Sequence, residues 1–345
     1  MHVHGGDVYN KSGVIDFSAN INLAGIPKGI SDAAKAGVDF SIHYPDVKCR
    51  KLKEAISDYI KIPTDYIRCG NGAADIIFSM VFAKKPKKAL MPAPSFYEYE
   101  QALRAVDCEI EYYILKEENE FSFDDGFIDA LDDTFDIVFI CNPNNPTGRL
   151  SSPEYLRKLL KKCSENNVLM VLDECFNDLI EEPEKYTIEK DILDNKNLLV
   201  LKAFTKIFAI PGLRLGFGLT SNKELLEKMA EVSQPWSVSV PAQMAGVAAL
   251  KETEYVKKSK ALIKEEKEFL LSEFDRLGIK VFGHGANYIF FKSIDNLSEM
   301  TKERDILIRD CSNYVGLKNG YYRIAVRGHE DNVKLISLFE ELLSK

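Results

Sequence analysis

Short apolar runs alternate with amphipathic stretches over the first 240 residues, and this alternation restricts the possible folds more than any other feature. The runs are rich in Val, Ile, Leu and Phe, as expected for strands of a mostly parallel sheet that is buried on both faces. One amphipathic stretch, residues 151–166, begins with serine and carries Pro153 near its first turn, which is typical of a helix start. We predict strands at Ala89–Met91, Ile110–Leu115, Asp136–Cys141, Val168–Leu172, Leu198–Leu201 and Arg214–Leu219. Strands joined by helices predict an α/β domain with helices on both faces of the sheet.

The pattern changes after Pro241 and predicts a smaller α+β domain. There we expect a long helix over residues 242–277, followed by a strand, a second helix, another strand and a final helix. These four lie at Tyr288–Phe291, Ser298–Arg309, Tyr321–Val326 and Glu330–Leu343. The predicted organisation is an N-terminal arm (residues 1–35) that packs with the small domain, a large domain (36–240) and a small C-terminal domain (241–345).

Composition excludes several classes of partner. The 345 residues carry a formal net charge of −8, so nucleic acid and anionic membrane surfaces are not expected partners. The sequence has no run of 18 apolar residues and no apolar core of a signal peptide near its start. Its seven cysteines form no CxxC pair and no zinc-like spacing, so we expect no metal and a cytoplasmic, reducing compartment.

Four segments of the large domain carry residues suited to chemistry. A polar turn that contains Asn145 follows one predicted strand, and Asp173 ends the next. Ligands of open α/β sheets bind at such strand ends. Lys206 follows a further strand within apolar surroundings, where burial lowers the pKa of an amine and favours imine formation, and Arg214 suits a phosphate. The small residues Gly72-Ala73-Ala74 open a predicted helix, whose free N–H groups also favour phosphate. Each segment alone also fits a plain turn or core position.

Taken together, these segments resemble the fold-type I pyridoxal 5′-phosphate (PLP) enzymes of the class I/II aminotransferase superfamily. The resemblance implies that Lys206 binds PLP covalently, that Asp173 pairs with the ring nitrogen and that Asn145 hydrogen-bonds the ring oxygen. It implies a phosphate site made of Gly72, Ala73, Ala74, Thr205 and Arg214, with Phe96 over the ring and Tyr97 as the competing choice. Phe176 stands where many relatives carry a tyrosine. Tyr44 matches a tyrosine that reaches the phosphate in a neighbouring subunit, which implies a homodimer with shared active sites.

The sequence also resembles one branch of this superfamily, the L-threonine-O-3-phosphate decarboxylases of cobalamin synthesis. The resemblance rests on His4-Gly5-Gly6, on residues 16–22, on the segment TKIFAIPGLRLG at 205–216 and on residues 306–311 and 321–327. It implies release of CO2 from L-threonine O-3-phosphate to give (R)-1-aminopropan-2-ol O-2-phosphate. The implied substrate contacts are Arg323 and Asn20 at the carboxylate and Arg309, His4 and Gly5 at the phosphate. Asn145 is a further implied substrate contact, and Arg327 could add to the phosphate contacts.

Three alternatives remain open at this stage. Decarboxylation and transamination differ in which bond of the α-carbon stands perpendicular to the ring, and orientation of the substrate decides this. An aminotransferase similar to histidinol-phosphate aminotransferase is therefore the second hypothesis. Phosphoserine is a possible substrate, because residues 22–25 and the short 6–16 segment depart from the decarboxylase pattern. A PLP-binding transcription factor is disfavoured, since only about 35 residues precede the large domain and the chain is acidic.

Overall fold

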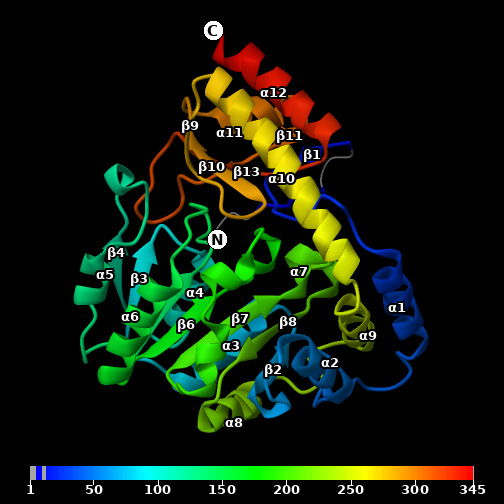
Figure 1. The fold of residues 1–345 in the computed structure, drawn as a ribbon, viewed down its shortest axis with the longest axis vertical. Helices are drawn as coiled ribbons and strands as arrows, with labels where there is room; N and C mark the ends of the chain where they lie inside the picture. The colour runs from blue at the N-terminus through cyan, green and yellow to red at the C-terminus, as the bar shows by residue number, and fades with distance from the viewer. Residues whose placement is uncertain (1–4, 10–12, 345) are drawn as a thin grey trace.

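The computed structural model describes residues 5–9 and 13–344, which form a seven-stranded sheet, a four-stranded sheet and a two-stranded pair. The larger sheet occupies the lower part of Figure 1, and the smaller sheet lies above it beneath α10 and α12. A parallel pair of two-residue strands joins the N-terminal arm to the upper part.

The large sheet has seven strands in the order β2-β8-β7-β6-β5-β3-β4. Only β8 runs antiparallel to its neighbours, so the sheet is mostly parallel, as predicted. The six predicted strands are all present, and β2, which precedes the glycine-rich turn, is an additional one. The strands are β2 Ile67–Gly70, β3 Lys88–Ala93, β4 Glu109–Ile114, β5 Ile137–Cys141, β6 Leu169–Asp173, β7 Leu198–Ala203 and β8 Gly216–Leu219.

Both faces of this sheet are buried, because alternate residues of each central strand enter different apolar clusters. In β5, Val138 and Ile140 join one cluster, whereas Ile137 and Phe139 join the other. The first face is covered by α2 Arg50–Ile60, α5 Asp125–Asp129, α6 Pro153–Glu165 and α9 Val240–Ala249, and the second by α3 Ala73–Lys84, α4 Tyr97–Arg104 and α8 Lys223–Val232. The Ser152 hydroxyl caps α6 by accepting a hydrogen bond from the backbone N–H of Tyr155 at 3.2 Å.

The smaller sheet is antiparallel, in the order β12-β13-β10-β9. Its strands are β9 Lys280–Gly283, β10 Tyr288–Lys292, β12 Arg309–Asp310 and β13 Tyr321–Ala325, and its helices are α10 Thr253–Arg276, α11 Leu297–Lys302 and α12 His329–Leu343. Phe274 of α10 and Phe339 of α12 are fully buried against Phe291 of the sheet. The predicted α/β fold with a smaller α+β part is therefore confirmed.

The N-terminal arm contacts both parts of the molecule. β1 Ile15–Asp16 pairs with β11 Ile306–Leu307, and Phe17 enters the apolar core of the small sheet. Farther along, α1 Lys28–Asp39 packs on α9, and Ile30 belongs to the core of the large sheet. The predicted domain boundaries at residues 35 and 240 are not tested by these contacts.

Two helices differ from the sequence-based expectation. The helix expected over 242–277 is two helices, since α9 ends at Ala249 and α10 begins at Thr253. Ala242 and Ala245 of α9 pack in the large core, whereas Phe274 of α10 packs in the small core. The helix expected over Ser298–Arg309 ends at Lys302, and the following residues form β11 and β12. Within the described ranges, no helix combines the length and apolar character needed to cross a membrane.

Replacing Phe274 with alanine should lower the free energy of unfolding by about 3–5 kcal/mol, because the truncation leaves a cavity in a close-packed aromatic core. The measurement is urea unfolding followed by circular dichroism. Val333→Ala on α12 is the matched control, since Val333 is 40% exposed and its truncation should cost less than about 0.5 kcal/mol. Equal losses for both variants would contradict this account of the small core.

Candidate active site

A cavity of about 320 Å³ lies where the strand ends of the large sheet meet the arm and the small sheet. The polar turn after β5, the end of β6 and the segment after β7 all contribute side chains, as expected for an open α/β sheet. The predicted residues that line it are Gly5, Asn20, Ala73, Ala74, Phe96, Asn145, Asp173, Phe176, Thr205, Lys206, Arg214, Arg309 and Arg323. The structure therefore gathers most of the predicted site residues around one space.

Lys206 lies in the short helix α7 Phe204–Ile207, directly after β7. Burial, together with the positive charges of Arg323 and Arg214, lowers the pKa of its amine to about 8. Its ammonium group lies 5.4 Å from the ring centre of Phe176. The lowered pKa increases the share of uncharged amine near neutral pH, and the uncharged amine is the form that can attack a carbonyl carbon.

Asp173, the last residue of β6, is 4% exposed and held by two hydrogen bonds. The Tyr99 hydroxyl donates to one carboxylate oxygen at 2.5 Å, and the backbone N–H of Cys175 donates to the other at 2.9 Å. Tyr99 itself stacks on Phe139 and meets the edge of Phe96. These contacts fix the carboxylate in one orientation toward the cavity.

Asn145 and Arg323 meet across the boundary between the two sheets. The Arg323 guanidinium donates to the Asn145 side-chain oxygen and, at 2.8 Å, to the backbone carbonyl of Ser18. Both acceptors are neutral, and Arg323 forms no ion pair with a carboxylate in the part of the chain described here. Nε of Arg323 and the side-chain oxygen of Asn20 are buried without a hydrogen-bond partner. This end of the cavity thus offers a positive charge to an anion.

The glycine-rich turn after β2 forms a cup with Arg214. Gly72 has φ +86°, and a Cβ added there would lie 2.6 Å from Nη2 of Arg214. Gly216 is equally confined, since its Cβ would meet the backbone nitrogen of Ala73 at 2.6 Å. The free N–H groups of α3 begin at Ala73, so the turn presents donors and a guanidinium to one small volume.

Arg309 is 5% exposed and lies in β12, rather than in the helix expected for residues 298–309. It donates to the side-chain oxygen of Asn313 at 2.9 Å and lies over the Tyr314 ring. In the N-terminal arm, the N–H of Gly6 donates to the Ser18 hydroxyl, and a Cβ at Gly5 would lie 2.3 Å from the Ser18 carbonyl oxygen. His4 lies outside the described residues.

Three of the predicted residues that the structure describes do not line this cavity, namely Gly72, which lies beside Arg214 in the cup, Arg327 and Tyr44. Arg327 pairs with Asp331 at 2.9 Å and donates to the Asp16 carbonyl at 3.0 Å, so it fastens the arm to α12. Tyr44 is 80% exposed and stacks on the half-exposed Trp236 at 4.6 Å. A contact of Tyr44 with a neighbouring subunit stays a prediction.

Sequence reasoning missed Glu98 and Tyr99. Glu98 lines the cavity from the first turn of α4, and burial raises the pKa of its carboxyl to about 7. The contact of Tyr99 with Asp173 could not be predicted from local sequence, because the two residues are 74 positions apart. Glu98 and Tyr99 could have been identified as candidates because they lie two and three residues after Phe96, in the first turn of α4.

The cavity fits the cofactor that the sequence implies. Lys206 supplies an amine of lowered pKa, Asp173 an oriented carboxylate and Asn145 an amide on the same wall. The Gly72 turn leaves room for no side chain where backbone N–H groups and Arg214 converge. The amine suits the aldehyde of PLP, the carboxylate its pyridine nitrogen and the amide its phenolic oxygen. The Gly72 turn with Arg214 suits its phosphate.

Comparisons with known proteins agree with this geometry. The model of the family "Aminotransferase class I and II" matches residues 12–336. Threonine-phosphate decarboxylase from Salmonella typhimurium is 33% identical, covering 99% of this chain and 96% of that protein. Histidinol-phosphate aminotransferase from Methanosphaera stadtmanae is 29% identical, with coverage of 96% and 90%.

A solved structure places the fold in the same group. The crystal structure of the histidinol-phosphate aminotransferase from Clostridium acetobutylicum superimposes with a TM-score of 0.90 at 32% identity, covering 96% of this chain and 99% of that one. The family match spans far more than half of the sequence. The chain therefore belongs to the aminotransferase class I and II family, and its cofactor is pyridoxal 5′-phosphate.

Proposed function

We propose that the protein is a PLP-dependent decarboxylase that converts L-threonine O-3-phosphate to (R)-1-aminopropan-2-ol O-2-phosphate and CO2. The observation that carries this proposal is the buried guanidinium of Arg323, whose hydrogen bonds go to neutral oxygens beside Lys206. A buried charge of this kind favours an anionic ligand, and a carboxylate matches the planar guanidinium.

A second guanidinium supports a substrate with two anionic groups. Arg309 lines the same cavity as Arg323 and is equally buried, while Arg214 belongs to the cup at Gly72. An amino acid that carries both a carboxylate and a phosphate would use Arg323 and Arg309 together. The 33% identity to the Salmonella decarboxylase points to the same substrate.

The residues of this chain would act by binding and orientation. When bound, PLP withdraws electrons from the α-carbon of an amino substrate. The uncharged amine of Lys206 can attack a carbonyl and can afterwards carry a proton. Arg323 and Asn145 would fix the carboxylate, and Arg309 the phosphate, so that the bond to CO2 is held in the reactive direction. Phe176 has no hydroxyl that could donate to the ring oxygen of PLP. Asn145 would therefore supply the polar contact to that oxygen.

The second candidate is an aminotransferase acting on histidinol phosphate. It is favoured by the 29% and 32% identity to two histidinol-phosphate aminotransferases. Such a reaction needs a 2-oxo acid as amino acceptor, whereas the decarboxylation needs none.

Purified holoenzyme should release CO2 from L-threonine O-3-phosphate without any 2-oxo acid, because decarboxylation requires no amino acceptor. Trapped ¹⁴CO2 from carboxyl-labelled substrate is the measurement, and O-phosphoserine, which lacks one methyl group, is the matched comparison. The decarboxylase proposal would be overturned if conversion of L-threonine O-3-phosphate required 2-oxoglutarate. It would also be overturned if the enzyme converted histidinol phosphate but not L-threonine O-3-phosphate.

Lys206→Ala should abolish the visible absorption band of the lysine-bound cofactor, because no other lysine lines the cavity among residues 5–9 and 13–344. With the unmodified chain, cofactor association with the apoenzyme should accelerate from about pH 7 to about pH 9 and then level off, since only the uncharged amine attacks. The sign follows from the lowered pKa near 8. An association rate that is constant or decreases over this range would contradict the assignment.

Arg323→Gln should lower kcat/KM for L-threonine O-3-phosphate at least about thirtyfold, equivalent to about 2 kcal/mol, through loss of a buried charge contact. Steady-state kinetics on the holoenzyme measures this. Arg327→Gln is the control, because Arg327 does not line the cavity and its substitution should change kcat/KM less than about threefold. A larger effect at Arg327 than at Arg323 would reverse the assignment.

A further inference from the structure

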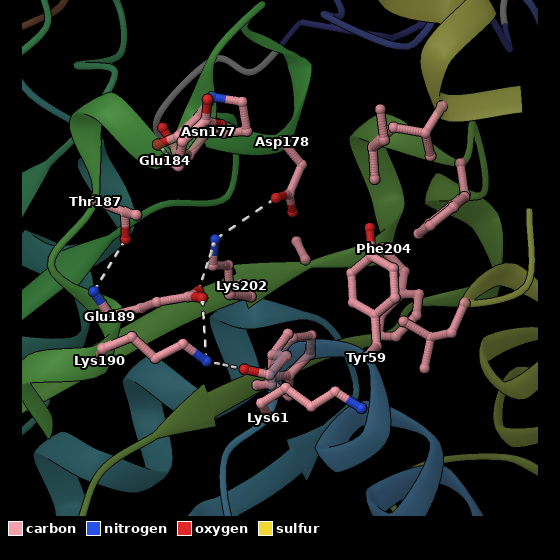
Figure 2. A pocket seen from close by; sticks show the side chains of 18 residues that line it. Tyr59, Lys61, Asn177, Asp178, Glu184, Thr187, Glu189, Lys190, Lys202 and Phe204 are labelled. Carbon is pink, nitrogen blue, oxygen red and sulfur yellow. Dashed lines mark hydrogen bonds and ion pairs between the residues drawn. The ribbon is translucent and has the colours of Figure 1, made fainter. Parts of the chain in front are cut away.

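Burial raises the pKa of two carboxyl groups in the described part of the chain to about 7, and their surroundings differ. One is Glu174, which forms an ion pair with Lys202 at 3.1 Å. Lys202 also pairs with Asp178 and Glu189 beside a second cavity, of about 420 Å³ (Figure 2). These carboxyl groups therefore interact with a lysine of the protein itself. The other carboxyl group with a raised pKa, that of Glu98, lines the active-site cavity instead.

Glu98 lies in the first turn of α4, two residues after Phe96. Among residues 5–9 and 13–344, Glu98 and Asp173 are the carboxyl groups that line the cavity, and the proposed reaction gives a role to Asp173 alone. Burial raises the pKa of the Glu98 carboxyl, the charges of Lys206 and Arg309 lower it, and the charge of Asp173 raises it. Glu98 therefore lies within electrostatic reach of the amine and of the guanidinium proposed to bind the substrate phosphate.

Glu98 lies at the Arg309 end of the cavity. Of the three guanidinium groups that line the cavity, that of Arg309 acts most strongly on the Glu98 carboxyl. The Arg309 guanidinium lies 5.1 Å from the ring centre of Tyr314. Burial raises the pKa of the Tyr314 hydroxyl, and the charge of Arg309 opposes this rise whereas that of Glu98 adds to it. A carboxyl group thus shares the end of the cavity that is proposed for a phosphate.

An ionised Glu98 would oppose the ligands that this cavity is proposed to hold. A phosphate monoester carries a charge of about −1.5 to −2 at neutral pH, and PLP and the substrate bring two such groups together with a carboxylate. Three guanidinium groups, those of Arg214, Arg309 and Arg323, line the cavity. Because neighbouring negative charges favour the protonated form of a carboxyl group, the ligands stabilise protonated Glu98. Its O–H is then a donor that a phosphate oxygen can accept.

We propose that Glu98 binds the substrate phosphate in its protonated form and donates its O–H to a phosphate oxygen beside Arg309. This inference rests on the proposed function, in which Arg309 holds the phosphate. The site would then take up a phosphate ester together with one proton. The raised pKa of Glu98, about 7, makes the protonated form available near neutral pH, and a bound phosphate dianion raises that pKa further.

The sign of the pH dependence follows from this raised pKa. Below about pH 7 Glu98 is protonated before the ligand binds, whereas above about pH 7 binding requires a proton from solution and weakens as the pH rises. The substrate phosphate, with a second pKa of about 6, is already a dianion in the upper range. Lys206, Asp173 and Tyr314 also reach Glu98 and can titrate. They are retained in Glu98→Gln, so the ratio of the unmodified chain to this variant isolates the Glu98 proton.

Steady-state kinetics of the holoenzyme with L-threonine O-3-phosphate measures this ratio. Glu98→Gln keeps an N–H donor at every pH. We expect the ratio of kcat/KM, unmodified chain over variant, to fall at least about fivefold from about pH 6.5 to about pH 8.5. Glu100→Gln is the matched control on α4, because Glu100 does not line the cavity, and its ratio should stay constant within about twofold. A ratio for Glu98→Gln that is constant or rises with pH would overturn the proposal.

Calorimetric titration with ethyl phosphate tests the same proton without the reaction and without a variant. At about pH 8, in two buffers of different ionisation enthalpy, the unmodified holoenzyme should take up at least about half a proton for each ligand bound. Glu98→Gln should take up almost none. Proton uptake by a chain that releases no CO2 from L-threonine O-3-phosphate would refute the decarboxylase function and support the role of Glu98. No binding of ethyl phosphate, or binding without proton uptake, would refute the role of Glu98.

Discussion

The lateral pairing of β5, β6 and β7 is the constraint on which the active site depends. Because these neighbouring strands are parallel, Asn145, Asp173 and Lys206 reach the same edge of the sheet from three different parts of the sequence. The antiparallel β8 lies between β7 and β2, so its first residues and the end of β2 meet at that edge as well. This pairing brings Arg214 onto Gly72. The order of the strands therefore brings Lys206, Asp173 and Asn145 to the cup formed by the Gly72 turn and Arg214.

The charges at this edge of the sheet determine which ligands the cavity favours and how reactive the Lys206 amine is. The chain carries a net charge of −8, yet the cavity collects Arg214, Arg309 and Arg323 around Lys206. Arg323 and Arg214 lower the pKa of the buried lysine, because their positive charges disfavour its protonated form. The same charges that would bind two phosphates and a carboxylate thus keep the amine reactive. In the proposed function, one arrangement of charges would both bind the anionic groups and activate the amine.

The sequence was most informative where a residue follows a short apolar strand, because strand order and strand ends are repeated features of this fold. Asn145, Asp173 and Lys206 could be predicted for this reason. The sequence predicts a helix over Ser298–Arg309, and the pairing with β13 shows that Arg309 lies in a strand. Tyr99 and the place of Arg327 depend on contacts between distant segments, to Asp173 and to the arm. Local patterns carry no information on such contacts.

The central claim is that Arg323 holds the substrate carboxylate and Arg309 the substrate phosphate within the cavity of Lys206. A crystal structure of the Lys206→Ala variant with PLP and L-threonine O-3-phosphate bound tests this claim most directly. The account predicts the carboxylate within hydrogen-bond distance of Arg323 and Asn145, with the bond to CO2 out of the ring plane, and the phosphate on Arg309. A carboxylate lying in the ring plane, or a phosphate bound away from Arg309, would contradict it.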